Sequence, residues 1–199
     1  VGLGDNALTA NTSGTSNTAI GHEALFANTT AANNTAVGKG ALKDNTTGTS
    51  NTALGKEASE NNTTGDNNTA VGTGALYTNT TASSNTAVGY SALLANTTGA
   101  LNSALGTDAL LANTTGADNV AIGAAAMKTN TTASNNTAVG YQAGYRNTTG
   151  VGLNAFGYQA LMTQVADGVE NNAFGTAALQ MNTTGDHNSA FGNEALEEK

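Results

Sequence analysis

Few side chains in this sequence could carry out chemistry, and those few are far apart. The chain has 199 residues, two histidines (His22 and His187) and no cysteine. Catalytic centres and zinc sites need several such groups close together. The H-E-x-x-H and G-x-S-x-G motifs of hydrolases are absent, as is a phosphate-binding loop between a strand and a helix. We therefore predict that the protein is not an enzyme and holds no cofactor or metal.

The carboxylates do not form a recognisable site. Two pairs of glutamates lie close together in the sequence, Glu57 with Glu60 and Glu197 with Glu198. Their surroundings vary along the chain, which indicates a solvated face. Three aspartates lie near one corner of the repeat described below, but not in consecutive repeats: Asp66, Asp118 and Asp186. A ladder of calcium ligands is therefore not expected.

Three tyrosines are the best candidates for a contact surface. Tyr90, Tyr141 and Tyr158 each follow a glycine that recurs throughout the chain. Tyrosine combines an apolar ring with a polar tip. The three residues could therefore bind a glycan or protein, or could be half-buried between chains.

A 17-residue repeat, N-T-A-[hydrophobic]-G-x-x-A-L-x-x-N-T-T-G-x-x, positions all of these residues. Its marker glycine occurs twelve times, at Gly4, Gly21, Gly38, Gly55, Gly72, Gly89, Gly106, Gly123, Gly140, Gly157, Gly175 and Gly192. The step from Gly157 to Gly175 is 18 residues. The pattern predicts one repeat domain over 1–199, made of twelve stacked coils with a single one-residue insertion. Because the chain begins in register, we expect it to be a segment of a longer fibre.

The composition of one coil favours strands. A second glycine follows the marker by ten residues in most coils, which would interrupt a long helix. We predict an all-β parallel solenoid, or β-roll, with two strands per coil, N-T-A-V (such as 34–37) and A-L (such as 41–42). A short helical turn at A-L-x-x-N is the alternative, because Ala and Leu favour helices.

Paired apolar positions predict an oligomer. An alanine precedes a larger apolar residue in nearly every coil, as in Ala36-Val37, and Ala-Leu pairs such as Ala41-Leu42 repeat the doubling. Neighbours in a strand point to opposite faces, so both faces would be buried. One thin coil has one interior, and the second face therefore needs another partner, either another chain or another part of the parent protein.

An asparagine recurs at the start of each N-T-T corner: Asn28, Asn45, Asn62, Asn79, Asn96, Asn113, Asn130, Asn147 and Asn182. Stacked coils would place these amides about 4.8 Å apart, close enough to hydrogen-bond along a ladder. The N-T-T sequence also fits the acceptor pattern for N-glycosylation. We favour the structural role and leave glycosylation open.

The coil after Gly157 departs from the repeat. It loses the N-T-T corner over 164–170 and contains the extra residue. From this coil onward the large apolar residue is phenylalanine, at Phe156, Phe174 and Phe191, and we expect the core to widen there. A ligand site at the altered corner is the alternative, since loops carry function more often than scaffolds do.

Composition excludes several classes of partner. The formal net charge is −8, with six basic residues that form no basic face, so nucleic-acid binding is not expected. No apolar run reaches the roughly 18 residues of a membrane span.

The block A-[IV]-G-x-x-A, present as Ala19–Ala24 and Ala87–Ala92, resembles the repeat of YadA-like head domains of trimeric autotransporter adhesins. The longer form, N-T-A-V-G-Y-Q-A-L-x-x-N-T-T-G, is similar to repeats of phage tail-fibre and related surface-fibre proteins. The resemblance covers the whole chain and implies parallel β-rolls, three chains side by side, and an extracellular attachment fibre at a cell surface or on a virion. The coil is longer than the adhesin repeat, which favours the fibre relatives.

These observations lead us to expect a stiff shaft or attachment head of an extracellular fibre, most consistent with a homotrimer that meets a cell-surface glycan or protein receptor. One alternative is a filament subunit that assembles end to end. Another is an ice- or glycan-binding solenoid that uses Thr or Asn ladders, suggested by pairs such as Thr29-Thr30. Adjacent threonines at a corner point in different directions, which argues against an ice-binding array.

Overall fold

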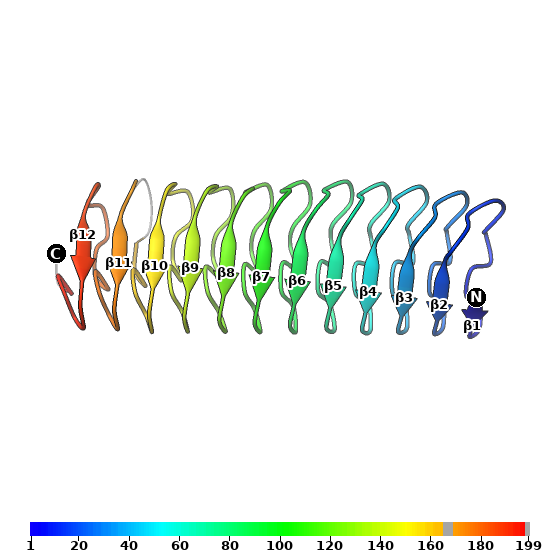
Figure 1. The fold of residues 1–199 in the computed structure, drawn as a ribbon, viewed down its shortest axis with the longest axis horizontal. Coiled ribbons are helices and arrows are strands. Elements are labelled where there is room, and N and C mark those ends of the chain that lie inside the picture. The colour runs from blue at the N-terminus through cyan, green and yellow to red at the C-terminus, as the bar shows by residue number, and fades with distance from the viewer. Residues whose placement is uncertain (165–168, 198–199) are drawn as a thin grey trace.

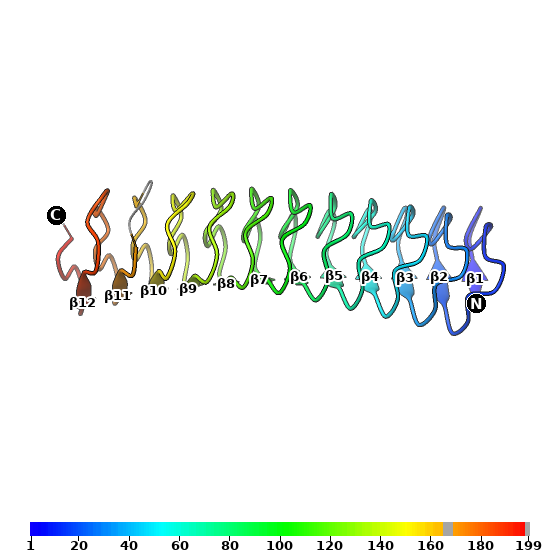
Figure 2. The same ribbon diagram turned by 90° about the horizontal axis from the view of Figure 1, so that it is seen from above.

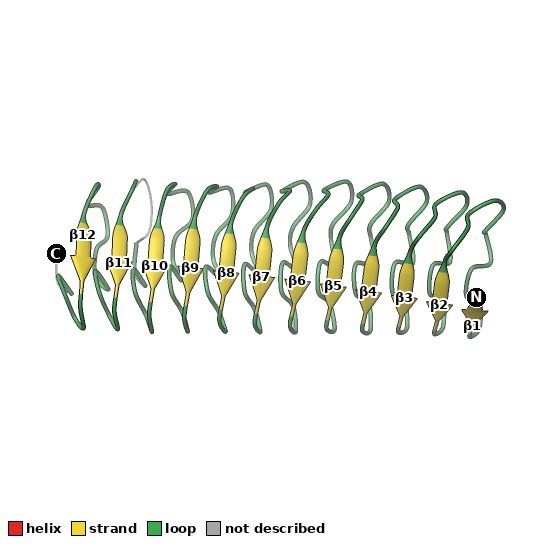
Figure 3. Cartoon of the chain, viewed as in Figure 1, coloured by secondary structure: helices red, strands yellow, loops and turns green. Residues whose placement is uncertain are grey.

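The computed structural model describes residues 1–164 and 169–197. Within them the chain forms twelve short strands joined by turns (Figures 1 and 3). The strands are β1 (Gly2–Leu3), β2 (Thr18–Ile20), β3 (Thr35–Val37), β4 (Thr52–Leu54), β5 (Thr69–Val71), β6 (Thr86–Val88), β7 (Ser103–Leu105), β8 (Val120–Ile122), β9 (Thr137–Val139), β10 (Asn154–Phe156), β11 (Asn172–Phe174) and β12 (Ser189–Phe191).

All strands belong to one parallel sheet in sequence order. Each coil stacks only on its neighbours, so the molecule is elongated, with its termini at opposite ends (Figures 1 and 2). Paired residues are 17 apart in sequence, as in Ala36 with Ala53. Across the insertion Ala155 still pairs with Ala173, so the sheet keeps its register. The predicted all-β parallel solenoid is confirmed.

Each strand from β2 to β12 turns its alanine inward and its flanking residues outward. In β3, Ala36 is fully buried, whereas Thr35 is exposed and Val37 is partly exposed. This alternation is the ordinary geometry of a strand. The first predicted strand, N-T-A-V, is therefore confirmed over its last three residues.

The second predicted strand is wrong, and so is the helical turn offered as its alternative. The A-L segment consists of tight turns: in one coil the Ala24 amide donates to the Gly21 carbonyl at 3.2 Å, and the Phe26 amide donates to the Glu23 carbonyl at 3.3 Å. Glu23 and Leu25 have positive φ angles of 56° and 51°. Because the backbone changes hand at alternate residues, Ala24 and Leu25 are both buried in the same interior.

The leucine of each A-L pair therefore needs no second chain to cover it, and the double-burial argument is wrong at this position. A left-handed conformation costs a non-glycine residue about 1–2 kcal/mol. Full burial of a leucine side chain contributes about 1.5–3 kcal/mol. Burial thus offsets the strain at Leu25, Leu42, Leu76 and the other fully buried leucines of the inner coils, whereas Leu8 and Leu196 in the end coils are partly exposed.

The marker glycine allows close approach of successive coils directly after each strand. Gly38 has a φ of +138°, and a Cβ there would lie 2.3 Å from the Gly55 carbonyl oxygen. Both the backbone angle and the contact require glycine. The other marker glycines from Gly4 to Gly175 make equivalent contacts with the next coil.

The core is a narrow column of Ala and Leu side chains that runs the length of the stack. The phenylalanines do not widen it, contrary to expectation. Phe156, Phe174 and Phe191 occupy the outward position of their strands, and Phe191 is 71% exposed. They lie on the outer face because their position in the strand alternates with the buried alanine.

Candidate functional site

The asparagines of the N-T-T corners form a hydrogen-bonded ladder inside the stack. The Asn62 Nδ2 donates to the Asn45 Oδ1 at 2.8 Å and to the Gly65 carbonyl of its own coil at 3.0 Å. Amide-to-amide bonds of this kind link consecutive coils without a break from Asn11 to Asn130. The ladder therefore cross-links the coils through side chains as well as through backbone.

This burial argues against glycosylation of the folded chain at these corners. Asn45 and Asn62 are fully buried, and the amide nitrogen of each is already a donor to two oxygens. The first threonine of the corner is also used internally, since the Thr46 hydroxyl donates to the Thr63 carbonyl at 3.0 Å. The second threonine, such as Thr47, is exposed.

A second asparagine ladder was missed by the sequence analysis. It uses the residue just before each strand: the Asn34 Nδ2 donates to the Gly48 carbonyl at 2.8 Å, and its Oδ1 accepts from the Asn51 amide at 2.9 Å. The recurrence of Asn four residues before the marker glycine was a visible signal. The pattern by itself predicts this asparagine only as the first residue of a strand.

Both ladders are interrupted near the coil that begins at Gly140. Asn147 bonds to Gly150 within its own coil, and Leu153 replaces the asparagine that would precede β10. Among the described residues, the Asn130 Oδ1 and the Asn136 Nδ2 are buried without a hydrogen-bond partner. These two atoms mark the point where the first ladder ends and the second is interrupted, and the second resumes between Asn171 and Asn188.

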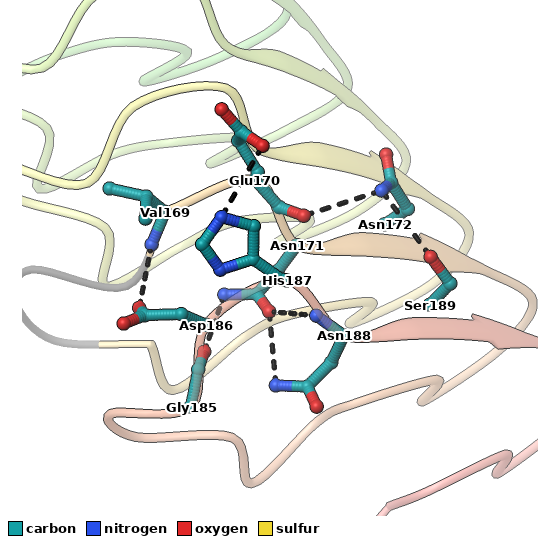
Figure 4. Close-up of polar contacts among 9 residues, drawn as sticks. All are labelled: Val169, Glu170, Asn171, Asn172, Gly185, Asp186, His187, Asn188 and Ser189. Carbon is teal, nitrogen blue, oxygen red and sulfur yellow. Dashed lines mark hydrogen bonds and ion pairs between the residues drawn. The ribbon is translucent and has the colours of Figure 1, made fainter.

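The altered corner regains the regular contacts on its C-terminal side (Figure 4). Residues 165–168 of this predicted site lie outside the described residues. After them, the Val169 amide donates to the Asp186 Oδ1 at 3.0 Å, and the Asn171 Nδ2 donates to the Gly185 carbonyl at 2.6 Å. Asn171 also accepts from the Asn188 backbone amide at 2.9 Å, as in regular coils.

The two histidines lie in widely separated coils, as expected, and each contacts carboxylates. The His187 Nε2 lies 3.5 Å from the Glu170 Oε2 (Figure 4). The His22 Nε2 lies 3.6 Å from the Asp5 Oδ2. Within the described ranges, no three His, Asp or Glu side chains gather as a metal site would require.

The carboxylates for which the sequence predicted no site make ordinary structural contacts. Asp66 accepts from the backbone amide and hydroxyl of Thr49 in the preceding coil, at 2.6 and 3.0 Å. Glu57 pairs with Lys56 at 3.2 Å, and burial raises the pKa of the nearby Glu60 carboxyl. Asp118 does not join Asp66 in any cluster. Of the second glutamate pair, Glu198 lies outside the described residues.

A tighter ion pair lies nearer the N-terminus. The Lys43 Nζ is 3.0 Å from the Glu23 Oε2. Its hydrogen bond lowers the pKa of the Glu23 carboxyl, and the same bond raises the pKa of Lys43. The side chains are partly exposed, so the pair links two coils at the surface.

The three predicted tyrosines fall into two groups. Tyr141 and Tyr158 stack with ring centroids 5.4 Å apart and an interplanar angle of 18°. Tyr90 lies three coils before Tyr141 and is 61% exposed. The sequence position that they share therefore does not create one continuous surface.

Tyr90 borders a surface hollow of about 320 Å³ that spans three coils. Tyr77 and Leu94 supply apolar walls, and the Lys56–Glu57 ion pair lies at its edge. Gly74 lies in the floor, at a position where neighbouring coils have Glu57 and Ser91. A side chain on Gly74 would contact Leu94 and Ser91, two residues that line the hollow.

The outer face of the sheet is a long surface on which apolar side chains are partly exposed. The first residue of each strand forms one column on this face, which is rich in hydroxyl groups and has exposed threonines in several strands. The third residue of each strand forms a second, apolar column, which includes Leu54 and Leu105, each 49% exposed. The column ends in a stack of Phe156, Phe174 and Phe191, with successive centroids 4.8 and 4.9 Å apart. None of the described strands contains a charged residue.

Comparisons with protein-family models, curated proteins and solved structures found no match. The described part of the chain also contains no helix that is long and apolar enough to cross a membrane.

Proposed function

We propose that this protein is a structural segment of an extracellular fibre, at a cell surface or on a virion, in which three copies pack through the outer faces of their sheets. The observation that carries the proposal is the apolar column along strands β2–β12. It runs the length of a stiff stack and leaves residues such as Leu54 and Leu105 half exposed in a single chain.

A second copy of the same chain is the occupant that best fits this face. Its apolar side chains recur at the spacing of the coils, so a parallel copy would present a column of the same period. The strands carry no charge although the chain has a net charge of −8, so close packing here would not bring like charges together. Long exposed apolar surfaces mark interaction sites in soluble proteins.

The mechanical role follows from nearest-neighbour stacking. Each coil is bonded to the next through the sheet, and asparagine ladders add further links before Gly140, so length increases in proportion to coil number. At about 4.8 Å per coil, the twelve strands span roughly 53 Å. A stiff spacer of this kind would hold an attachment site away from its base. End-to-end growth into a filament remains the structural alternative.

Light scattering coupled to size exclusion tests the assembly. We expect a particle of three chains of 19.6 kDa each. The double variant Leu54→Glu and Leu105→Glu should convert it to a folded monomer, because each change places charge in the apolar column. The matched control changes Thr64 and Thr115, exposed corner residues of the same coils, to Glu and should leave the mass unchanged. A folded wild-type monomer at high concentration would contradict the proposal.

Ice binding is a second candidate because of a threonine column that the sequence analysis did not weigh. Thr35 in β3, Thr52 in β4 and Thr86 in β6 are exposed on the outer face of the sheet. They are separate from the threonines of the N-T-T corner. They form a regular array of hydroxyl and methyl groups with the apolar column beside it. Thermal hysteresis of the purified protein would support this function. Assembly through the same face would cover the threonines and abolish the hysteresis.

A further inference from the structure

We infer that the hollow beside Tyr90 binds an uncharged sugar unit of a glycan. The hollow is formed within one chain by turn residues of three successive coils, and none of these residues belongs to a strand. The inference goes beyond the proposed assembly, because the site needs neither a second copy nor the outer face of the sheet.

The walls of the hollow suit the apolar face of a pyranose ring. Tyr90 presents a ring that is 61% exposed, and Tyr77 and Leu94 line the same hollow. The face of an aromatic ring carries partial negative charge, which attracts the weakly positive C–H groups on one face of a sugar. The volume of about 320 Å³ is at the lower end of the range for small-molecule sites and suits one or two sugar units.

The polar groups supply partners for the sugar hydroxyls. Ser91 is only 5% exposed and lines the hollow, and its hydroxyl has no hydrogen-bond partner among the described residues. A Cβ placed on Gly74 would lie 3.8 Å from the Ser91 Oγ, so this oxygen borders the space above the glycine. The Ser91 Oγ is not among the fully buried side-chain atoms, so it is accessible at the hollow and can donate to or accept from a ligand hydroxyl.

The charges at the edge favour a neutral ligand. Lys56 and Glu57 are 3.2 Å apart and neutralise each other, while both retain exposed polar atoms. An ammonium and a carboxylate side by side can donate to and accept from neighbouring hydroxyl groups. An anionic sugar or a phosphate would instead meet the Glu57 carboxylate at the edge of the site.

Gly74 allows the hollow to be filled without disturbing the coil. Its φ is +66°, and the same coil position is occupied by Gln142 and Gln159 at φ angles of 53° and 55°. A Cβ on Gly74 would make only ordinary contacts, 3.7 Å from Leu94 Cδ1. Gly74→Gln should therefore fold normally and block the site. Ala125→Gln, at the same coil position three coils away, is the matched control.

Saturation-transfer NMR with methyl glycosides of glucose, galactose, mannose and N-acetylglucosamine tests the inference. We expect transfer to the ring protons of at least one glycoside, lost in Gly74→Gln and Tyr90→Ser but kept in Ala125→Gln. Ser91→Ala should weaken binding about two- to tenfold. Circular dichroism and particle mass of each variant establish that it is folded.

Three results would overturn the inference: no transfer to any of the four glycosides, equal transfer in wild type and Gly74→Gln, or stronger binding of methyl sialoside or inorganic phosphate than of every neutral sugar. The Leu54→Glu, Leu105→Glu variant separates this site from assembly. It should bind the glycoside as well as wild type does, because loss of assembly leaves the hollow intact. Conversely, Gly74→Gln should lose glycoside binding and keep the particle mass of wild type.

Discussion

The coils before and after Gly140 have the same sheet but different side-chain ladders. In the first region, buried amides bond from coil to coil without a break from Asn11 to Asn130. In the second, Asn147 and Asn182 bond within their own coils. Strand pairing nevertheless continues through β12. The backbone ladder and the marker glycines therefore suffice to propagate the fold.

The second region has aromatic stacks in place of the amide ladder. The Phe156 and Phe174 rings are 4.8 Å apart, and the Tyr141 and Tyr158 rings are 5.4 Å apart. Ring stacking contributes about 0.5–1.5 kcal/mol per pair beyond area burial. The two regions thus use different side chains for the same purpose, the linkage of one coil to the next. The asparagine ladder lies inside the stack, and the aromatic stacks lie on its outer surface.

The largest expected effect comes from the glycines that allow this backbone contact. Gly38→Ala should destabilise the protein by about 3–5 kcal/mol, because it combines a glycine-only backbone conformation with a clash against the next coil. Gly192 has no following coil in the described structure, and a Cβ there would meet only the Ala195 Cβ at 3.9 Å. Gly192→Ala should therefore cost about 1–2 kcal/mol. Urea denaturation would measure both values, and equal losses would refute the role given to coil contact.

Much of this backbone could be predicted from the sequence, because the period shows directly which residues stack. The N-T-A-V strand and the twelve coils followed from the marker glycine. The A-L segment could not be predicted, since it depends on left-handed conformations at Leu25 and Glu23 that neither residue favours by itself. Only burial inside the completed stack makes these conformations favourable.

The candidate sites were predicted less well, for a related reason. Tyr90, Tyr141 and Tyr158 share a coil position, but whether they form one surface depends on the residues in the coils between them. A side chain at Gly74, one coil away from Tyr90, would contact two residues that line the hollow. A repeat pattern emphasises residues that recur, whereas this site arises where neighbouring coils differ.

The next largest effect should come from the amide ladder itself. Asn79 makes three side-chain bonds, to Asn62, to Ala82 and from Asn96. Asn79→Ala should destabilise by about 2–3 kcal/mol, because it leaves buried partners unsatisfied in two adjacent coils.

Asn147→Ala is the matching change in the second region. Among the described residues the Asn147 side chain exchanges bonds only with Gly150, so its loss should cost about 1–2 kcal/mol. Thermal and urea unfolding of the two variants would compare the regions directly. A larger loss for Asn147→Ala would mean that bonds between coils contribute no more than bonds within a coil.

A smaller, stabilising effect is expected at Ser59, a buried polar residue in the core of the first region. Ser59 occupies the position of the buried leucines, is 1% exposed, and its hydroxyl has no hydrogen-bond partner among the described residues. Ser59→Leu should add about 1–2 kcal/mol, through burial of apolar surface and removal of the unsatisfied hydroxyl. A rise in Tm with an unchanged particle mass would support this. A lower Tm would show that neighbouring side chains already fill the space.

The smallest effect should come from the surface ion pair that joins two coils of the first region. The folded pKa of Glu23 lies below its usual value, so the pair's contribution is present above the unfolded pKa and is lost as pH falls through the folded one. Lys43 has a raised pKa, so its contribution is lost only as pH rises through that value. Glu23→Gln should therefore lower Tm slightly near neutral pH and have no effect in strong acid. Because exposed pairs are screened by salt, 1 M NaCl should reduce the difference. A difference that persisted in both acid and high salt would mean that Glu23 acts through packing against its neighbours and not through charge.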